Sequence, residues 1–368
     1  MRKFFIYLLL IVPLVVSSAD FKNDFYRVQN IGSGRYIYVT DNTGKLDVQS
    51  MSIEAGAVQL WKGFNRAVSD PASVIYIKEY KKDKKYDLIS QGIGIHDMIG
   101  YYVQVYYDED EDYWEVYAEG RYLYDSDESN RDRGYLDIKR GNLNYRHWNL
   151  LPIDSDNNYF GLTPNVVSGY KYYKPFYADF AFSFLGTGMK AWYVNRLEKD
   201  AVVISEVPGD IVPDRTPVFV ECSSGQPVDN KLALYKSSGT ELEDNLLKGV
   251  YFQNNERYIK SKDARTAYDP ETMRVLGVMN DGRLGYITSD IKYLNANESY
   301  LTVPKGYPSQ IPVMTQEEYS EYTSVRPVPV DNASGTVWTI NGIRLGSDVD
   351  WESLPSGIYI LNGLKVRK

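Results

Sequence analysis

Alternating apolar and polar positions recur along most of the chain and predict β-strands. Residues 36–39, 74–77 and 101–107 alternate in this way, and their tyrosine and β-branched side chains suit a pleated, half-buried surface. The pairs Asp-Gly at 281–282 and Asn-Gly at 341–342 are typical of tight turns between strands. After the first 19 residues, no long segment has the 3.6-residue apolar period of an amphipathic helix. The predicted fold class is therefore all-β.

A short pattern occurs twice in the N-terminal third and predicts repeated β units. Gly34–Tyr38 (Gly-Arg-Tyr-Ile-Tyr) returns 86 residues later as Gly120–Tyr124 (Gly-Arg-Tyr-Leu-Tyr), and Trp61 is followed 87 residues later by Trp148. An offset near 87 is twice about 43, which leaves room for a degenerate copy between the two. We therefore predict three lobes that together fill residues 20–154.

The N-terminal end has the composition of a cleaved secretory signal. Arg2 and Lys3 precede an apolar run over residues 4–16, and the small residues Ser17 and Ala19 follow it. The alternative is a membrane anchor, but an apolar run of about 13 residues is shorter than the roughly 20 that span a bilayer. We predict a signal peptide over residues 1–19 and no transmembrane segment after its cleavage.

The remainder of the chain is predicted to hold a second all-β region and a tail. A polar cluster at residues 154–158 marks the end of the first domain. Residues 155–320 contain short strand-like runs about ten positions apart, which predict a β-sandwich-like region, with a barrel as the alternative. A polar, proline-rich stretch at 321–335 is predicted to be an extended linker, and it leads to a tail at 336–368.

The charge argues against a nucleic-acid-binding protein, and the cysteine content excludes a protein stabilised by internal disulfides. The chain has 49 acidic and 41 basic side chains, and its net charge of −8 becomes more negative when the signal is removed. An acidic surface repels phosphate backbones, so nucleic acid is not an expected partner. Cys222 is the only cysteine, so an internal disulfide is impossible and stability must come from burial.

No pattern in the sequence predicts catalysis, a metal or a cofactor. His96 and His147 each lack a second histidine at ligand spacing, and no Gly-x-Ser-x-Gly elbow occurs. The acidic run at 108–112 is typical of a solvated loop. Residues 125–130 could offer oxygens to calcium, but they lack the glycine and the distal glutamate of an EF-hand. We therefore expect that the protein is not an enzyme and that it has no catalytic residue, no metal ligand and no cofactor.

The N-terminal domain resembles the ricin-B-type lectin modules, which are β-trefoils. The resemblance rests on the three lobes and on the Gln-x-Trp signature at Gln59 and Trp61; in the third lobe Arg146 and His147 replace the glutamine before Trp148, and the second lobe has no clear equivalent. It implies core roles for Gln59, Trp61 and Trp148. It also implies shallow sugar sites, where Asp and polar side chains bind hydroxyls and an aromatic ring stacks on the sugar.

Candidate ligand contacts follow from that resemblance, lobe by lobe. The aromatic and polar residues at matching places are Tyr38, Asp41, Asn42 and Asp47 in the first lobe, and Tyr124, Asp125, Asp127 and Asp137 in the third. Asp and Asn also favour turns for reasons of backbone geometry alone, so plain turn and surface roles remain the alternative.

The tail is similar to the C-terminal sorting segments of Bacteroidetes proteins that use the type IX secretion system. The similarity covers residues 337–345, with strand, Asn-Gly turn and strand, and residues 354–368, which contain Leu-Pro-Ser-Gly-Ile-Tyr-Ile. It implies passage across an outer membrane. An ordinary terminal hairpin is the alternative.

Together these patterns predict a secreted or cell-surface protein, outer-membrane-associated or released, that binds without catalysing a reaction. A glycan is the expected ligand of the first domain. The alternative is a structural or protein-interaction component of the cell surface in which the trefoil is only a scaffold, and a polysaccharide- or protein-directed enzyme is the third hypothesis.

Overall fold

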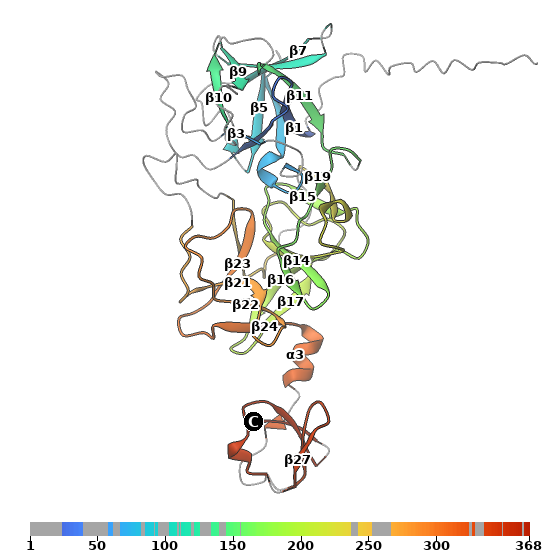
Figure 1. Cartoon of the computed structure of the whole chain (residues 1–368), viewed down its shortest axis with the longest axis vertical. Helices are drawn as coiled ribbons and strands as arrows, with labels where there is room; N and C mark the ends of the chain where they lie inside the picture. Colours follow the sequence, from blue (N-terminus) through green and yellow to red (C-terminus); the bar gives the residue numbers. More distant parts are fainter. Residues whose placement is uncertain are drawn as a thin grey trace, which may run out of the picture. The chain divides into compact units, whose positions relative to one another are not determined.

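The structure is a computed structural model, and two compact units account for the residues that it describes (Figure 1). The described residues are 24–39, 58–61, 67–81, 85–91, 93–94, 103–108, 110, 112–118, 121–125, 134–139, 145–154, 156–236, 242–251, 266–323, 326–327, 335–347, 349–362 and 364–368. The first unit reaches Gly161 and takes in Leu232–Lys236, and the second begins at Leu162.

Strands dominate both units, and the predicted all-β fold class is confirmed. From Asp24 to Gly161 the elements are β1 (Asp24–Asn30), β2 (Tyr36–Val39), β3 (Val58–Trp61), the 3-10 turn η1 (Pro71–Ser73), β4 (Ile75–Lys81), β5 (Lys85–Ser90), β6 (Ile93–Gly94), β7 (Val103–Asp108), β8 (Tyr113–Ala118), β9 (Arg121–Asp125), β10 (Gly134–Lys139), β11 (His147–Pro152) and β12 (Phe160–Gly161).

Six strands of the first unit close into a ring. β1 pairs with β4, β4 with β5, β5 with β7, β7 with β8, β8 with β11, and β11 again with β1, all antiparallel. Each ring strand sends a buried side chain into one shared core: Val28, Ile77, Leu88, Val105, Val116 and Leu150. Closure removes unpaired strand edges from the ring, and the period-2 alternation of each strand places one face inside.

Within the part of the chain that the structure describes, two hairpins interrupt the ring at equivalent points. β2 and β3 pair with each other between β1 and β4, and β9 and β10 pair with each other between β8 and β11. The repeated tyrosine pattern lies on β2 and β9, which are therefore equivalent strands. The order of ring strand, hairpin and ring strand thus occurs twice.

The two tryptophans of the sequence repeat do not occupy equivalent strands. Trp61 ends the hairpin strand β3, whereas Trp148 lies on the ring strand β11. The equivalent strands β3 and β10 begin at residues 58 and 134, which are only 76 positions apart, because the segment between β2 and β3 is longer than the segment between β9 and β10. The shared offset of the tryptophans is therefore not a structural repeat.

A buried arginine extends the first unit beyond the predicted boundary at residue 154. Arg27 on β1 is fully buried, and its Nη1 donates to Asn158 Oδ1 (2.7 Å) and to the Tyr159 carbonyl (3.1 Å). Its other donors reach the Ser73 hydroxyl and the Ala67 carbonyl. Burial lowers the pKa of Arg27 to about 10, so the group stays charged at neutral pH. The polar cluster that follows β11 thus supplies hydrogen-bond acceptors to the buried Arg27 guanidinium.

From Leu162 to Thr323 the described residues form further short strands and the helix α3. They are β13 (Val166–Ser168), β14 (Lys171–Phe176), β15 (Ala181–Phe184), β16 (Lys190–Leu197), β17 (Val202–Glu206), β18 (Val218–Cys222), the 3-10 turn η4 (Pro227–Asp229), β19 (Lys231–Tyr235), β20 (Leu247–Val250), β21 (Met273–Val278), β22 (Leu284–Ile287), β23 (Glu298–Thr302), β24 (Gln310–Thr315) and α3 (Gln316–Thr323).

A curled sheet of ten strands encloses the core of the second unit. Its order is β13-β14-β18-β16-β17-β24-β22-β21-β23-β20, and all neighbours are antiparallel except β17 and β24. The sheet curls so far that β13 and β14 also contact β21 and β23. Buried side chains from both halves meet inside, among them Val202, Phe219, Tyr286, Leu301 and Ile311.

The segment that we predicted to be an extended linker begins as a helix. α3 opens with a capping box: the Glu318 amide donates to Thr315 Oγ1 (3.2 Å), and the Thr315 amide donates to Glu318 Oε2 (2.7 Å). Residues 321–323 are therefore helical, in contrast to the extended conformation predicted from the proline-rich composition.

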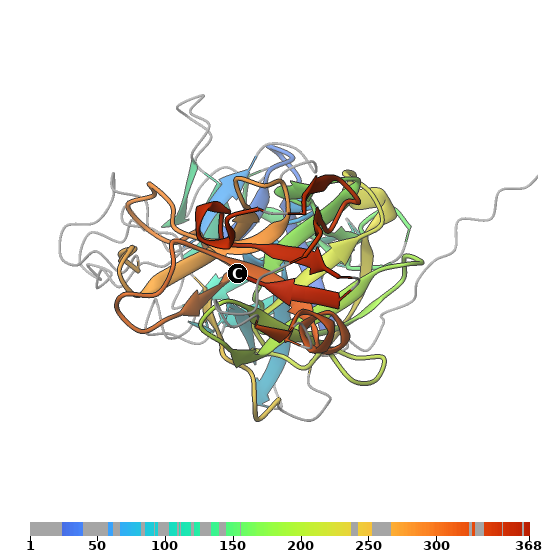
Figure 2. The same ribbon diagram turned by 90° about the horizontal axis from the view of Figure 1, so that it is seen from below.

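The C-terminal residues form a five-stranded sheet with a core of its own. Its strands are drawn in dark red near the C-terminus in Figure 2. Its elements are β25 (Arg326–Pro327), β26 (Val337–Thr339), β27 (Arg344–Gly346), the 3-10 turn η6 (Trp351–Ser353), β28 (Ile358–Leu361) and β29 (Leu364–Arg367). Val337, Trp351 and Tyr359 are buried together. Across the described residues, no helix has the length and apolarity needed to cross a membrane.

Candidate functional site

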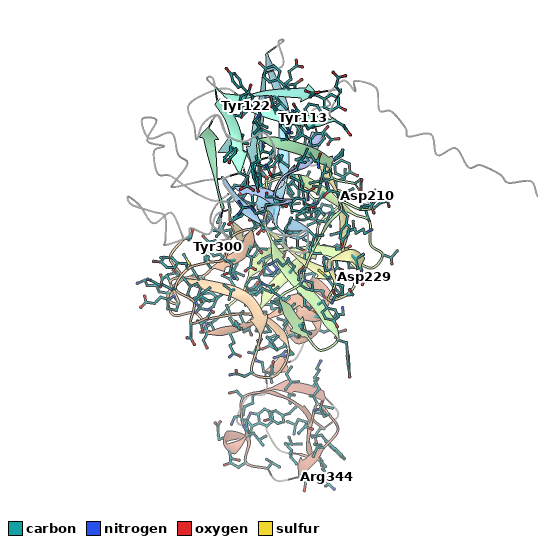
Figure 3. The ribbon with its side chains drawn as sticks, turned by 45° about the horizontal axis from the view of Figure 1, so that its top comes forward. Tyr113, Tyr122, Asp210, Asp229, Tyr300 and Arg344 are labelled. Carbon is teal, nitrogen blue, oxygen red and sulfur yellow. The ribbon has the colours of Figure 1, made fainter. Side chains whose placement is uncertain are left out.

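The outer face of β7, β8 and β9 carries a group of tyrosines. On β8, Trp114 and Val116 contact the core, so alternation turns Tyr113, Glu115 and Tyr117 to the opposite face. Tyr106 on β7 and Tyr122 on β9 lie on the same face, and the Tyr106 side chain is 40% exposed. We call this surface, defined by Tyr106, Tyr113, Tyr117 and Tyr122 with Glu115, Arg146 and His147, the tyrosine face. Tyr113 and Tyr122 are labelled in Figure 3.

Three of its rings contact one another across the three strands. The Tyr106 and Tyr117 centroids are 6.1 Å apart at 65°, and those of Tyr117 and Tyr122 are 5.3 Å apart at 60°. Both pairs have the edge-to-face geometry that aromatic quadrupoles favour, worth about 0.5–1.5 kcal/mol beyond burial. The rings therefore hold one another in a fixed arrangement at the surface.

Charged groups border the rings on the β11 side. The Arg146 guanidinium lies 4.3 Å from the Tyr122 centroid, in cation–π contact. Its Nε is 2.7 Å from Glu115 Oε1, an ion pair that lacks the alignment of a hydrogen bond. His147 stacks on Tyr113 with centroids 3.5 Å apart and rings 8° from parallel, and its Nε2 is 3.5 Å from Glu115 Oε1. Glu115 thus connects the cation to the imidazole.

Burial sets the protonation of this surface at neutral pH. Desolvation lowers the pKa of His147 most, Arg146 lowers it further, and Glu115 opposes both. Desolvation also raises the pKa of Tyr106, and it raises that of Tyr113 together with a hydrogen bond to Asp108. The face therefore presents a neutral imidazole and protonated phenols, which donate and accept hydrogen bonds.

Two of the predicted contact residues, Tyr38 and Tyr124, lie mostly inside the first unit. Each is 8% exposed, and they occupy equivalent positions on β2 and β9. Tyr124 packs edge-on against Tyr145, with centroids 6.1 Å apart. Neither ring lies open at the surface.

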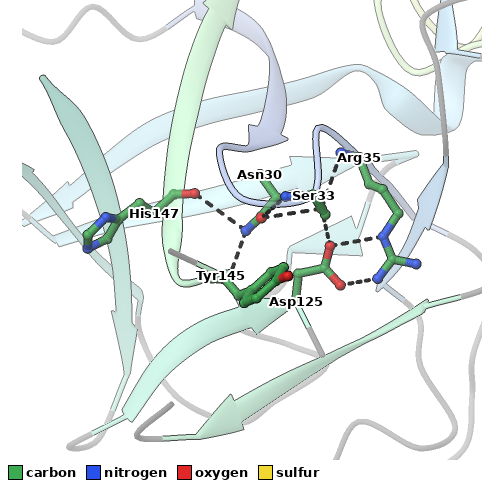
Figure 4. A network of polar contacts seen from close by, with 6 residues as sticks. All are labelled: Asn30, Ser33, Arg35, Asp125, Tyr145 and His147. Carbon is green, nitrogen blue, oxygen red and sulfur yellow. Dashed lines mark hydrogen bonds and ion pairs between the residues drawn. The ribbon is translucent and has the colours of Figure 1, made fainter. Parts of the chain in front are cut away.

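Asp125, which we predicted to contact a sugar, is an interior residue. Its side chain is 0% exposed; Arg35 Nε donates to its Oδ2 at 2.9 Å, and Arg35 Nη2 and the Ser33 hydroxyl make further short contacts (Figure 4). The arginine of the repeated pentapeptide neutralises this carboxylate. The expected outward role of Asp125 is therefore replaced by a buried ion pair.

The same polar network fixes the turn after β1. Asn30 Oδ1 accepts from the Ser33 amide at 3.0 Å, and Asn30 Nδ2 donates to the carbonyls of Tyr145 (2.8 Å) and His147 (3.4 Å), as Figure 4 shows. The network thus joins the turn to β9 and to the start of β11. These hydrogen bonds join residues of the first unit to one another.

The remaining predicted residues divide between the core and parts of the chain whose side chains are not described. Trp148 is 0% exposed, and its Nε1 donates to the Leu123 carbonyl at 3.1 Å. The backbones of Gln59 and Trp61 lie on β3, and that of Asp137 lies on β10. The other predicted contacts, Asp41, Asn42, Asp47 and Asp127, are outside the described residues.

Sequence reasoning missed the tyrosine face. The signal was present at positions 113, 115 and 117, where tyrosine and glutamate alternate with Trp114 and Val116. Both faces of β8 are aromatic, however, so alternation alone does not tell which face points to solvent. Arg146 and His147 were noted only as a departure from the lectin signature.

No group of three or more His, Cys, Asp or Glu side chains converges as metal ligands would within the described parts of the chain.

Comparisons with known proteins give little further information. No family model matches the sequence, and no curated protein matches it. Among solved structures, that of a mosquitocidal holotoxin aligns with 78% of this chain at 11% identity and a TM-score of 0.28. The alignment covers 42% of the holotoxin chain, so this chain spans less than half of its length. A similarity at this TM-score supports no assignment of fold or function.

Proposed function

We propose that the chain is a non-catalytic binding protein of the cell exterior and that the tyrosine face of its first unit recognises carbohydrate. The supporting observation is the set of mutually packed rings of Tyr106, Tyr117 and Tyr122 beside the Arg146–Glu115 pair. The apolar C–H faces of a sugar ring stack on aromatic side chains. Fixed polar groups at the border then orient its hydroxyls.

We infer that this unit is a β-trefoil. A closed ring of six strands with hairpins inserted between ring strands is the architecture of that fold, and both described hairpins, β2–β3 and β9–β10, support it. In this arrangement β5 and β7 are the ring strands of the middle lobe, at the position of the degenerate copy. The binding face proposed here lies on the wall of the ring, whereas the lectin resemblance implied shallow sugar sites beside Tyr38 and Tyr124.

Glycan arrays and calorimetry on the chain without its predicted signal test the carbohydrate proposal. We expect Tyr117→Ala to weaken glycan binding at least about tenfold, the loss of one well-packed aromatic contact. Tyr170→Ala is the matched control, because Tyr170 is a fully exposed tyrosine of the second unit. Equal affinities of the two variants, or no glycan bound by the folded protein, would contradict the proposal.

Protein recognition is the second candidate function. Tyrosine and arginine are enriched at the energetic centres of protein interfaces, and the tyrosine face contains both. Cross-linking on intact cells distinguishes the two functions. A protein partner captured through this face, with capture unaffected by competing sugars, would favour the scaffold role over glycan binding.

For localisation, we propose that residues 1–19 direct export and that residues 336–368 act as a sorting tail for the cell surface or the medium. The separate core around Val337, Trp351 and Tyr359 supports treating the tail as a module that can be removed. Deleting residues 337–368 should retain the protein in the periplasm, as detected by fractionation. Unchanged secretion of the deleted form would rule out the sorting role.

A further inference from the structure

A cavity of about 160 Å³ lies in the second unit, where the curled sheet brings its two ends together. Val166 of β13 and Pro175 of β14 line one wall, and Leu276 of β21 lines the other. Leu294, in the segment before β23, adds a further apolar side chain. β13 contacts β21, and β14 contacts β23, without ladder pairing between them. The cavity therefore lies between two sheet ends that no strand ladder among the described residues joins.

A fixed carboxylate lies among the apolar and polar side chains that line the cavity. Glu298 Oε1 accepts from Asn165 Nδ2 at 2.6 Å and from Lys174 Nζ at 2.7 Å, and its Oε2 accepts from Asn295 Nδ2 at 3.0 Å. The side chains of Glu298 and Lys174 are 16% and 19% exposed. A carboxylate offers about four lone pairs, so with three donors among the described residues one acceptor position remains, on Oε2.

The charge of the site is already balanced. Lys174 pairs with Glu298, so an added cation or anion would lose its hydration without gaining an uncompensated partner. Tyr300, labelled in Figure 3, also lines the cavity, and desolvation raises the pKa of its hydroxyl. A ligand of this cavity should therefore be uncharged.

Size restricts the ligand further. A cavity of about 150 Å³ lined by aliphatic and aromatic side chains accommodates one benzene ring. From its volume, the apolar side chains on both of its walls and the open acceptor of Glu298, we propose that this cavity binds an uncharged, ring-sized group that carries one hydrogen-bond donor. The ring packs against Val166, Leu276 and Leu294, and its hydroxyl or N–H donates to Glu298 Oε2. This site belongs to the second unit and does not depend on the carbohydrate proposal.

Phenol and benzene are suitable probes, because they share a ring and differ in the donor. Ligand-observed NMR and calorimetry with the full chain should show phenol binding about tenfold or more tightly than benzene, since a hydrogen bond to a charged acceptor contributes about 1.5–3 kcal/mol. Glu298→Gln should remove most of the preference for phenol and leave benzene binding in place. A folded protein that binds neither probe at millimolar concentration would overturn the proposal.

Two neighbouring valines provide a matched test of position. Val166 lines the cavity, whereas Val167 is 51% exposed. Val166→Phe should abolish binding of both probes, and Val167→Phe should leave it unchanged. If Val166→Phe does not fold, Ser289→Phe obstructs the same cavity from another lining position. Probe binding that survives in a folded Val166→Phe or Ser289→Phe variant would place it elsewhere and refute the assignment.

Discussion

Two tyrosines of the second unit differ in the hydrogen-bond partners of the hydroxyl. Tyr268 donates to the Met273 carbonyl at 3.0 Å and accepts from the Ser289 amide at 3.1 Å. Tyr286 is 0% exposed in the core, and its hydroxyl has no hydrogen-bond partner among the described residues. Burial of a hydroxyl without a partner costs about 1–3 kcal/mol, so the two phenols should have opposite effects on stability.

Removal of each hydroxyl measures this difference directly. We expect Tyr286→Phe to raise the free energy of unfolding by about 1 kcal/mol, or to leave it unchanged where an internal water serves the group. Tyr268→Phe should lower it by about 2 kcal/mol, because two hydrogen bonds of about 1 kcal/mol each are lost. Urea titrations of the two variants provide the test. A destabilised Tyr286→Phe would mean that its hydroxyl has a strong partner in the folded protein.

The imidazole of His147 should make stability depend on pH. Its pKa in the folded state lies below the ordinary 6.5, so between the two values the unfolded chain binds more protons than the folded one. The contribution of His147 to the free energy of unfolding is therefore fully present above pH 6.5. It is lost as the pH drops from 6.5 through the folded pKa. His147→Gln should reduce this dependence.

NMR titration measures the same effect at the residue itself. The chain has two histidines, so His96→Gln leaves one imidazole signal, that of His147. Arg146→Gln should raise the pKa of His147, and Glu115→Gln should lower it, because the first removes a repelling cation and the second a stabilising anion. Shifts in the reverse directions would contradict the proposed electrostatics.

Among the elements, β9 is joined to the turn after β1 by the Arg35–Asp125 pair, which is 2% and 0% exposed. Removing one member of a buried ion pair leaves an uncompensated charge, which costs about 3–5 kcal/mol, whereas replacing both members by apolar groups is often neutral. We expect Arg35→Met to lower the free energy of unfolding by that amount. The double variant Arg35→Met with Asp125→Leu should recover most of it, as measured by chemical unfolding. Additive losses would show that the two side chains do not interact.

The positions of the strands were easier to predict from the sequence than the correspondence between strands of the repeated units. The Tyr-Ile-Tyr and Tyr-Leu-Tyr copies identified β2 and β9 correctly, because the same strand role selects the same alternation. Trp61 and Trp148 were paired wrongly, because connecting segments of different length shift every offset that follows them. The helix α3 was missed because eight residues are too few for a clear helical period, although Thr315 and Glu318 form its capping box.

The candidate site was less predictable than the fold. Asp125 is the last residue of β9, where an aspartate can serve a turn, a ligand or an ion pair equally well. Only the approach of Arg35, 90 positions earlier, decides the outcome. The tyrosine face combines side chains from β7, β8, β9 and β11, and its composition depends on strand pairing that no local pattern encodes.

At the scale of the whole molecule, the two units have separate cores. Val28 lies in the core of the first unit and Val202 in that of the second, and both are at most 1% exposed. Each Val→Ala change removes two methyl groups and should cost about 2 kcal/mol. In scanning calorimetry we expect Val28→Ala and Val202→Ala to shift different components of the unfolding transition. Identical shifts of one common transition would show that the cores unfold together.

The parallel pairing of β17 with β24 has a consequence for synthesis of the chain. Val202 is aligned with Val313, so the first strand leaves the ribosome 111 residues before its neighbour. During that interval β17 has Val202, Val203 and Ile204 beside an unoccupied edge, and apolar strand edges recruit other chains. Nascent or truncated chains that stop between residues 207 and 309 are therefore the fragments most prone to aggregate, and the ones that a chaperone would have to shield.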